Sequence, residues 1–204
     1  MRNERKFMGL KDLILSVLLS LLMLVIAVAV VVPLAVLDIL TASILSLVIP
    51  ATVCGMIYVL MTTKAPRIGT YFTFSFVFGA FYVISGSVTT AILFCITGII
   101  GELTMIGGRG KKWRAFVPYL LHWLTYTYAA TIQFLFMRDA VVQTYISMGM
   151  DEATALSTVD MYGAIYTAPA NMLLCGVCAV AASLLGYFIG VKLLRKHFAA
   201  AGVA

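Results

Sequence analysis

The chain has 204 residues, of which 63% are hydrophobic and only 11% are charged, and its net charge is +6. Soluble domains are nearer half apolar and a quarter charged, so this composition excludes an ordinary soluble protein. Loops that meet anionic lipid headgroups account for the positive charge, and no nucleic-acid partner is expected. We expect a single membrane domain over residues 1–204, with no room for a soluble catalytic domain.

Six apolar runs are each long enough to cross a bilayer as a helix, which takes about 17–25 residues. The first run is longer than the core of a signal peptide and has no clear small-residue cleavage site, so we interpret it as a retained helix. The sequence therefore predicts an all-α integral membrane protein with six transmembrane helices. They are expected at residues 11–32, 42–62, 68–84, 87–106, 115–136 and 167–191.

The basic residues lie almost entirely on one side of this pattern, and only Arg138 falls on the other. Lys and Arg loops are retained on the cytoplasmic side, so both termini and the 107–114 loop are predicted to be cytoplasmic. The other thirteen Lys and Arg residues are Arg2, Arg5, Lys6, Lys11, Lys64, Arg67, Arg109, Lys111, Lys112, Arg114, Lys192, Arg195 and Lys196.

The outward connection 137–166 is unusually long, and its pattern is helical. Val141, Val142, Tyr145 and Ile146 follow the spacing of one apolar helix face. Gly149 interrupts this stripe, and Asp151 is suited to cap a second short helix, in which Ala153, Leu156 and Val159 share a face. Long connections of this kind are often functional. We predict an extracellular helical lid over the outer mouth of the bundle.

Small residues at four-residue spacing predict close helix contacts, because packing replaces the hydrophobic effect in lipid. Ser16 and Ser20 form one such pair in the first run. A longer row in the last run is expected to pack within the chain. Its members are Cys178, Ala182, Gly186 and Gly190.

Residues that could support catalysis or hold a metal are almost absent from the runs. We find no H-E-x-x-H, no paired acids and no Ser-His-Asp order, so no catalytic and no metal-ligating residue is assigned. His122 is interpreted as a packed, hydrogen-bonded side chain, and Cys175 and Cys178 as small packing residues. Glu102 lies at the inner boundary, where water or the basic loop can satisfy it. We predict that the chain is not an enzyme.

Neutral polar and aromatic side chains instead gather in the outward half, beneath the predicted lid. Aromatic rings with a few hydrogen-bonding groups are typical of small-molecule sites. An aromatic belt at the membrane interface is the alternative, but it does not explain Gln133 and Asn171. The predicted substrate-binding residues are Tyr82, Ser85, Thr89, Tyr128, Gln133, Tyr162, Tyr166 and Asn171.

Three short motifs, together with the six-run pattern, carry a family resemblance. They are Lys64-Ala65-Pro66-Arg67, Gly101-Glu102 with its basic loop, and the ending Lys192-Leu193-Leu194-Arg195-Lys196-His197-Phe198 followed by Ala201-Gly202. The chain resembles the substrate-binding (S) component of an energy-coupling factor (ECF) transporter, of the Trep_Strep, or MptD-like, branch.

The resemblance implies a multi-pass protein of the bacterial cell membrane that captures a small molecule at its outer face for ATP-driven uptake. It implies a transmembrane coupling subunit and two cytoplasmic ATPases as partners. Ser16 and Ser20 match the row that contacts the coupling subunit, where the family typically has alanine. Vitamin-like molecules, haem or another tetrapyrrole, and metal chelates are the implied substrates. No cofactor is expected, although four lid methionines could face a haem: Met137, Met148, Met150 and Met161.

Two other classes of function remain open at this stage. The chain could be a structural or assembly subunit of another membrane complex, in which the tyrosines only pack. It could also be an intramembrane enzyme.

Overall fold

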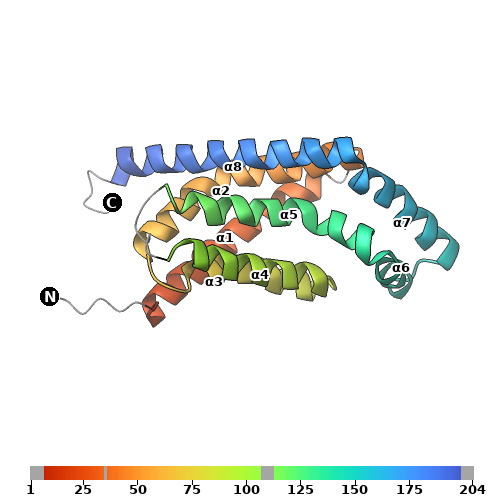
Figure 1. Ribbon diagram of the computed structural model, residues 1–204, viewed down its shortest axis with the longest axis horizontal. Helices are drawn as coiled ribbons and strands as arrows, with labels where there is room; N and C mark the ends of the chain where they lie inside the picture. Colours follow the sequence, from red (N-terminus) through yellow and green to blue (C-terminus); the bar gives the residue numbers. More distant parts are fainter. Residues whose placement is uncertain (1–6, 35, 107–112, 199–204) are drawn as a thin grey trace.

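The computed structural model describes residues 7–34, 36–106 and 113–198, and this part of the chain folds into eight α-helices (Figure 1). Each of the six predicted runs corresponds to one helix, with ends that differ by a few residues. The exception is the last helix, which continues seven residues beyond the predicted end. The helices are α1 (Leu10–Leu34), α2 (Ile39–Lys64), α3 (Thr70–Ile84), α4 (Val88–Thr104), α5 (Phe116–Phe136), α6 (Arg138–Ser147), α7 (Glu152–Thr167) and α8 (Pro169–Phe198).

Three helices in the described residues are long and apolar enough to cross a membrane, namely α1, α2 and α8. Helices α3 and α4 are apolar but shorter, with 15 and 17 residues. At 1.5 Å per residue, 15 residues rise roughly 23 Å, against about 30 Å for the hydrocarbon core. Helix α5 has 21 residues, but threonines and tyrosines interrupt its apolar character. The chain is thus an all-helical protein with several membrane-span candidates.

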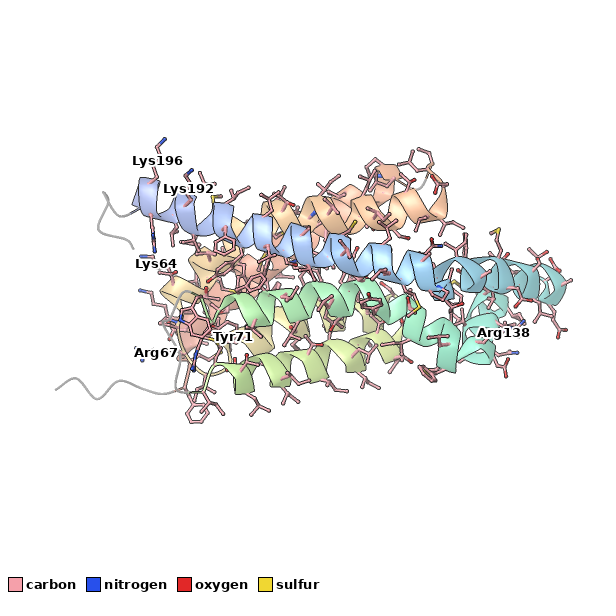
Figure 2. All side chains as sticks on the ribbon, turned by 45° about the horizontal axis from the view of Figure 1, so that its top comes forward. Lys64, Arg67, Tyr71, Arg138, Lys192 and Lys196 are labelled. Carbon is pink, nitrogen blue, oxygen red and sulfur yellow. The ribbon has the colours of Figure 1, made fainter. Side chains whose placement is uncertain are left out.

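The long helices lie side by side, and α5 lies between α4 and α8 (Figure 1). Basic side chains mark one end of this bundle. Figure 2 shows Lys64, Arg67, Lys192 and Lys196 at that end and Arg138 at the opposite end. We call these the basic end and the lid end. Six of the thirteen basic residues predicted to be cytoplasmic lie outside the described part of the chain: Arg2, Arg5, Lys6, Arg109, Lys111 and Lys112.

Helices α2 and α8 approach each other closely because their contact is built from glycines. A Cβ at Gly190 would lie 2.6 Å from the carbonyl oxygen of Gly55, and one at Gly186 would meet the carbonyl of Ala51. Ala182, one turn before Gly186, is also buried. The prediction that this row of small residues packs within the chain is confirmed.

Aromatic side chains fill the centre of the bundle. His122 is fully buried there, with its ring stacked on Phe74 at 3.8 Å between centroids. Its Nδ1 lies 3.2 Å from the Ser75 hydroxyl. Trp123 contacts the same ring edge-on at 5.4 Å. His122 is therefore a packed, hydrogen-bonded core residue, as the sequence predicts.

Glu102 ties the end of α4 to the start of α3 at the basic end. Its Oε1 accepts hydrogen bonds from the backbone N–H groups of Gly69, Tyr71 and Phe72, at 2.9, 2.8 and 3.2 Å. These N–H groups have no partner within the helix, and a carboxylate also suits the positive end of a helix dipole. A side chain from one helix thus caps its neighbour.

Candidate functional site

Two neighbouring chambers lie inside the bundle toward the lid end. The inner chamber, of about 190 Å³, lies among α2, α5, α7 and the start of α8. The outer chamber, of about 570 Å³, lies between the α1–α2 connection, the α3–α4 turn and helices α6 and α7. Five residues line both chambers and mark where they meet: Val31, Ser43, Ser46, Ala130 and Tyr166.

Helices α6 and α7 form the roof of the outer chamber. Val142 on α6 and Ala155 and Val159 on α7 make a small buried cluster, against which Phe134 of α5 also packs. Gly149, between the two helices, has φ +97°, a left-handed conformation that suits glycine. The prediction of two short helices in this connection is confirmed.

The start of α7 is capped as the sequence predicts. The Asp151 carboxylate accepts a hydrogen bond from the Thr154 N–H at 3.0 Å. Hydrogen bonding to Thr154 lowers the pKa of Asp151 below its ordinary value. The ionised carboxylate is therefore the form that stabilises this end of the helix.

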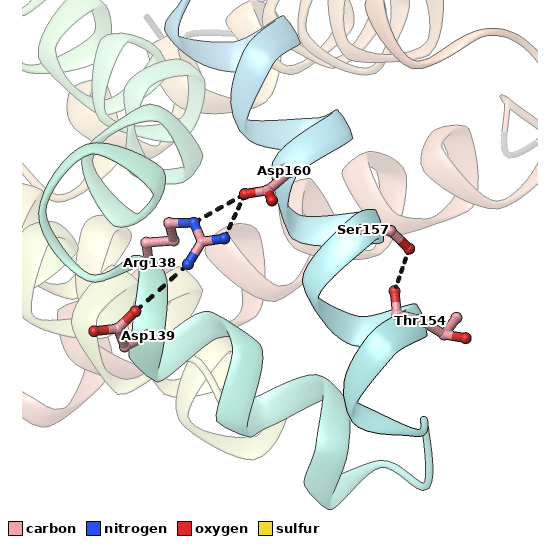
Figure 3. Close-up of polar contacts among 5 residues, drawn as sticks. All are labelled: Arg138, Asp139, Thr154, Ser157 and Asp160. Carbon is pink, nitrogen blue, oxygen red and sulfur yellow. Dashed lines mark hydrogen bonds and ion pairs between the residues drawn. The ribbon is translucent and has the colours of Figure 1, made fainter.

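An ion pair joins the two roof helices on their exposed side (Figure 3). Nε and Nη2 of Arg138 donate to Oδ1 of Asp160 at 2.9 and 2.6 Å. Asp139 lies 3.6 Å from the same guanidinium, but its side chain is 98% exposed. The hydrogen bond to Asp160 is the main reason why the pKa of Arg138 is raised. This pair links the first residue of α6 to the middle of α7.

Tyr166 stands where the two chambers meet, and its position is fixed on both sides. Its ring stacks on Phe134 with centroids 5.5 Å apart and an interplanar angle of 7°. Its hydroxyl lies 3.0 Å from the Ser43 hydroxyl of α2. The roof helix α7 is therefore joined directly to α2 at the boundary between the chambers.

The two amides singled out in the sequence both lie at the cavity, and both have partners within the chain. Gln133 Nε2 donates to the hydroxyls of Ser87, at 2.6 Å, and Thr90. Asn171 Nδ2 donates to the carbonyl of Ile165 at 3.0 Å, across the break between α7 and α8. Each amide therefore holds two elements together at the cavity wall.

Seven of the eight predicted substrate-binding residues line a chamber. Thr89 lines neither, and its hydroxyl donates to the Met137 sulfur at 3.1 Å. Tyr82, Tyr128 and Asn171 line the inner chamber, Ser85, Gln133 and Tyr162 line the outer chamber, and Tyr166 lines both. This placement brings them together at the lid end, and their contact with a substrate stays a prediction.

Sequence reasoning missed the contribution of α2. Ser43 and Ser46 line both chambers, although the second apolar run showed no sign of a site. The available signal was their i, i+3 spacing, which places two hydroxyls on one helix face. Thr144 and Tyr145 of α6 were also missed as lining residues.

The methionines of the predicted lid are mostly outside the cavity. Only Met148 lines the outer chamber. Met137, Met150 and Met161 are 38%, 37% and 51% exposed. Three of the four side chains that could face a haem thus line neither chamber.

The expectation that Ser16 and Ser20 contact a partner subunit needs correction. Both are fully buried inside this chain, and the Ser20 hydroxyl lies 3.6 Å from the Met61 sulfur of α2. A four-residue row of small side chains signals close approach, and here the approaching helix is the chain's own. Neither hydroxyl is accessible to another protein in this arrangement.

The cavity offers hydrogen bonds and aromatic surface but no charge. Among the described residues, neither chamber is lined by Asp, Glu, Lys, Arg or His. The same part of the chain contains no group of three His, Cys, Asp or Glu residues placed to hold a metal ion. What the arrangement can do is hold a small molecule by shape and neutral hydrogen bonds.

Residues 10–200 match a family described as "Hypothetical bacterial integral membrane protein (Trep_Strep)". No curated protein and no solved structure matches the chain.

Proposed function

The chain belongs to the Trep_Strep family of bacterial integral membrane proteins, and we propose that it captures a small molecule as the substrate-binding subunit of an ECF-type importer. The observation that carries the proposal is the pair of chambers beneath the α6–α7 roof. Their walls combine tyrosine rings with neutral hydroxyl and amide groups. Small-molecule sites are built in this way, with mostly apolar walls and a few placed polar groups.

The proposal includes an orientation with six transmembrane helices, α1 to α5 and α8, in the cell membrane. The basic end faces the cytoplasm and the lid end faces outward. The separation of Lys64, Arg67, Lys192 and Lys196 from Arg138 supports it (Figure 2). The chambers then open toward the side from which an imported molecule arrives.

The roof supplies a means of admitting that molecule. The links from α7 to the bundle include the Ser43–Tyr166 contact and the bond from Asn171 to Ile165. The link between α6 and α7 on the exposed side is an ion pair at the surface. Such contacts are individually weak, so the roof helices are suited to move as a unit while the glycine-packed α2–α8 pair stays fixed.

The partners in this proposal are a transmembrane coupling subunit and two cytoplasmic ATPases, which would supply the energy for uptake. The support is the family resemblance of the motifs at the basic end. Ser16 and Ser20 are buried within this chain, so the proposal does not place the contact with the coupling subunit at these residues.

A structural or assembly subunit is the second candidate, and one observation favours it. Gln133 and Asn171 are already hydrogen-bonded within the chain, as they would be if they served only to pack helices. This reading leaves the two chambers without a role. A test must therefore show whether they are occupied.

Native mass spectrometry of the full chain, purified from its membrane in mild detergent, tests the proposal. A bound small molecule is expected in the wild type and is expected to be lost in Ala130→Phe, which fills the boundary between the chambers. Ala140→Phe, at an exposed position on α6 that lines neither chamber, is the matched control. Co-purification of ATPase and coupling subunits with both variants would support the importer.

Two results would count against the proposal. A wild-type chain that carries no small molecule under any condition of purification favours the assembly role. A bound molecule that is equally retained in Ala130→Phe would lie somewhere other than in the chambers.

A further inference from the structure

Six of the eight hydroxyl groups that line the inner chamber donate a hydrogen bond within the protein, and those of Tyr82 and Tyr126 are the other two. Thr127 donates to the carbonyl of Trp123 at 2.7 Å. Tyr128 donates to the carbonyl of Met172 at 2.9 Å. A carbonyl oxygen can only accept a hydrogen bond, so in both bonds the hydroxyl is the donor.

The two hydroxyls that link α2 to α7 follow the same rule. Ser43 donates to the carbonyl of Ile39 at 2.7 Å, so its single proton is committed. With that proton directed at the Ile39 carbonyl, Tyr166 is the donor in the 3.0 Å contact between the Ser43 and Tyr166 hydroxyls. Ser46, one turn on, donates to the carbonyl of Ser43 at 2.9 Å.

Thr131 completes the pattern, because its hydroxyl donates to the backbone carbonyl of Tyr166 at 3.1 Å. A hydroxyl has one proton and two acceptor lone pairs. Once the proton is committed, the oxygen can offer a ligand only acceptance. Most hydroxyl oxygens of the inner chamber are therefore hydrogen-bond acceptors, held in place by their own donated bonds.

No charged group balances this surface. None of the described residues that line the inner chamber is Asp, Glu, Lys, Arg or His. An ion buried there without a counter-charge would lose its hydration and gain little in return. A carboxylate or phosphate would in addition place most of its acceptors against the acceptor oxygens of the wall.

Aromatic rings complete the wall and are fixed from behind. Tyr126 packs edge-on against Trp123 with centroids 5.4 Å apart, and Tyr82 stacks on Phe94 at 5.6 Å. Rings that are already immobilised lose little entropy when a ligand packs on them. They offer a flat partner the contact area that aromatic pairs use.

We propose that the inner chamber binds an uncharged, flat molecule that presents N–H or O–H donors to the hydroxyl oxygens. This inference rests on the proposed capture function and names its substrate class. It excludes haem from the inner chamber, since the haem propionates are anionic acceptors with no cation to meet them.

Matched ligands can test the class even though the natural substrate is not known. The purified full chain would be titrated calorimetrically with nicotinamide, uracil and adenine as neutral donor-bearing rings. For nicotinamide, the controls are N,N-dimethylnicotinamide without N–H donors, nicotinate as the anion and 1-methylnicotinamide as the cation. At least one neutral ring is expected to bind, and loss of its donors or gain of charge should weaken Kd by about tenfold or more.

Two near-isosteric variants locate the binding. Thr131→Val and Ser46→Ala each remove one acceptor oxygen from the inner chamber and should weaken the neutral ligand. Thr52→Val, at a hydroxyl of α2 that donates to the Val48 carbonyl and lines neither chamber, should leave its Kd unchanged.

Each other outcome overturns a definite part of the inference. A charged compound that binds more tightly than the neutral rings, with a Kd that Thr131→Val weakens, overturns the substrate class but leaves capture intact. A neutral ligand indifferent to both Thr131→Val and Ser46→Ala overturns the location. If no compound of the panel binds, the inferred substrate class is wrong. If the wild-type chain also carries no molecule in native mass spectrometry, the proposed capture function is wrong as well.

Discussion

The hydroxyls of Ser43 and Tyr166 lie 3.0 Å apart and join α2 to α7 at the boundary between the two chambers. Tyr166→Phe keeps the ring on Phe134 but removes this bond. One hydrogen bond contributes about 0.5–1.5 kcal/mol, so local opening of α7 should rise roughly two- to tenfold. Hydrogen–deuterium exchange of the α7 amides measures it. Tyr162→Phe is the control, because its hydroxyl makes no hydrogen bond within the described residues. Equal exchange in the two variants would contradict a stabilising bond between Ser43 and Tyr166.

The ion pair between Arg138 and Asp160 should make the roof sensitive to salt. Both side chains are partly exposed, at 43% and 60%, which limits such a pair to about 0.2–1 kcal/mol. Arg138→Ala and Asp160→Ala should each speed exchange of the α6 and α7 amides, and the double variant should add little. The effect should fade at high ionic strength. Asp139→Asn is expected to do almost nothing, and an effect as large as that of Asp160→Ala would contradict the assigned partner.

The cap at Asp151 should give α7 a dependence on acid pH. Because the folded pKa is lowered, the stabilisation is present above the unfolded value of 3.8 and is lost as pH falls through the folded pKa. Asp151→Asn keeps an N-capping side chain that does not titrate. Amide exchange at 152–156 should therefore match between wild type and variant at pH 6 and be faster in the wild type near pH 3. A constant ratio at both pH values would argue against the cap.

The helices of this protein could be predicted from its sequence because each apolar run ends in residues that stop a membrane helix. Asp38 caps α2 and Lys64 ends it, while Ser85 and Gly86 separate α3 from α4. Asp151 fixes the start of α7 in the same local way. Each of these signals acts on residues close to it in the sequence, so it can be recognised without knowing the tertiary structure.

The site could be predicted only in outline, because its geometry depends on which helix faces which. The sequence indicated polar groups at the outer end of α5 and at the start of α8. It did not indicate that α2 would bring Ser43 and Ser46 to the same cavity. The spacing of Ser16 and Ser20 predicted close packing correctly, but the sequence could not say that the neighbouring helix belonged to the same chain.

The close contact of α2 with α8 should make Gly190 intolerant of even one methyl group. A Cβ there lies 2.6 Å from the Gly55 carbonyl oxygen, and backbone cannot yield cheaply. Gly190→Ala should destabilise the chain by about 1–3 kcal/mol, through strain and helix separation. Gly163→Ala is the matched control, because its Cβ would make an ordinary 3.7 Å contact with Phe134. Thermal unfolding in detergent compares them, and equal midpoints would refute the close approach.

The separation of charge along the bundle predicts its orientation in the membrane. Ser147, at the end of α6, and Lys196, near the end of α8, are both exposed and lie at opposite ends. In a background from which Cys54, Cys95, Cys175 and Cys178 have been replaced, a membrane-impermeant thiol reagent should label Ser147→Cys on intact cells. Lys196→Cys should react only after the cells are permeabilised.

The physical reason for this orientation is that segments rich in Lys and Arg are held on the cytoplasmic side, and thirteen of the fourteen Lys and Arg residues lie in the segments assigned to that side. Labelling of Lys196→Cys from outside would reverse the orientation and place the mouth of both chambers in the cytoplasm, where they could not capture an external molecule.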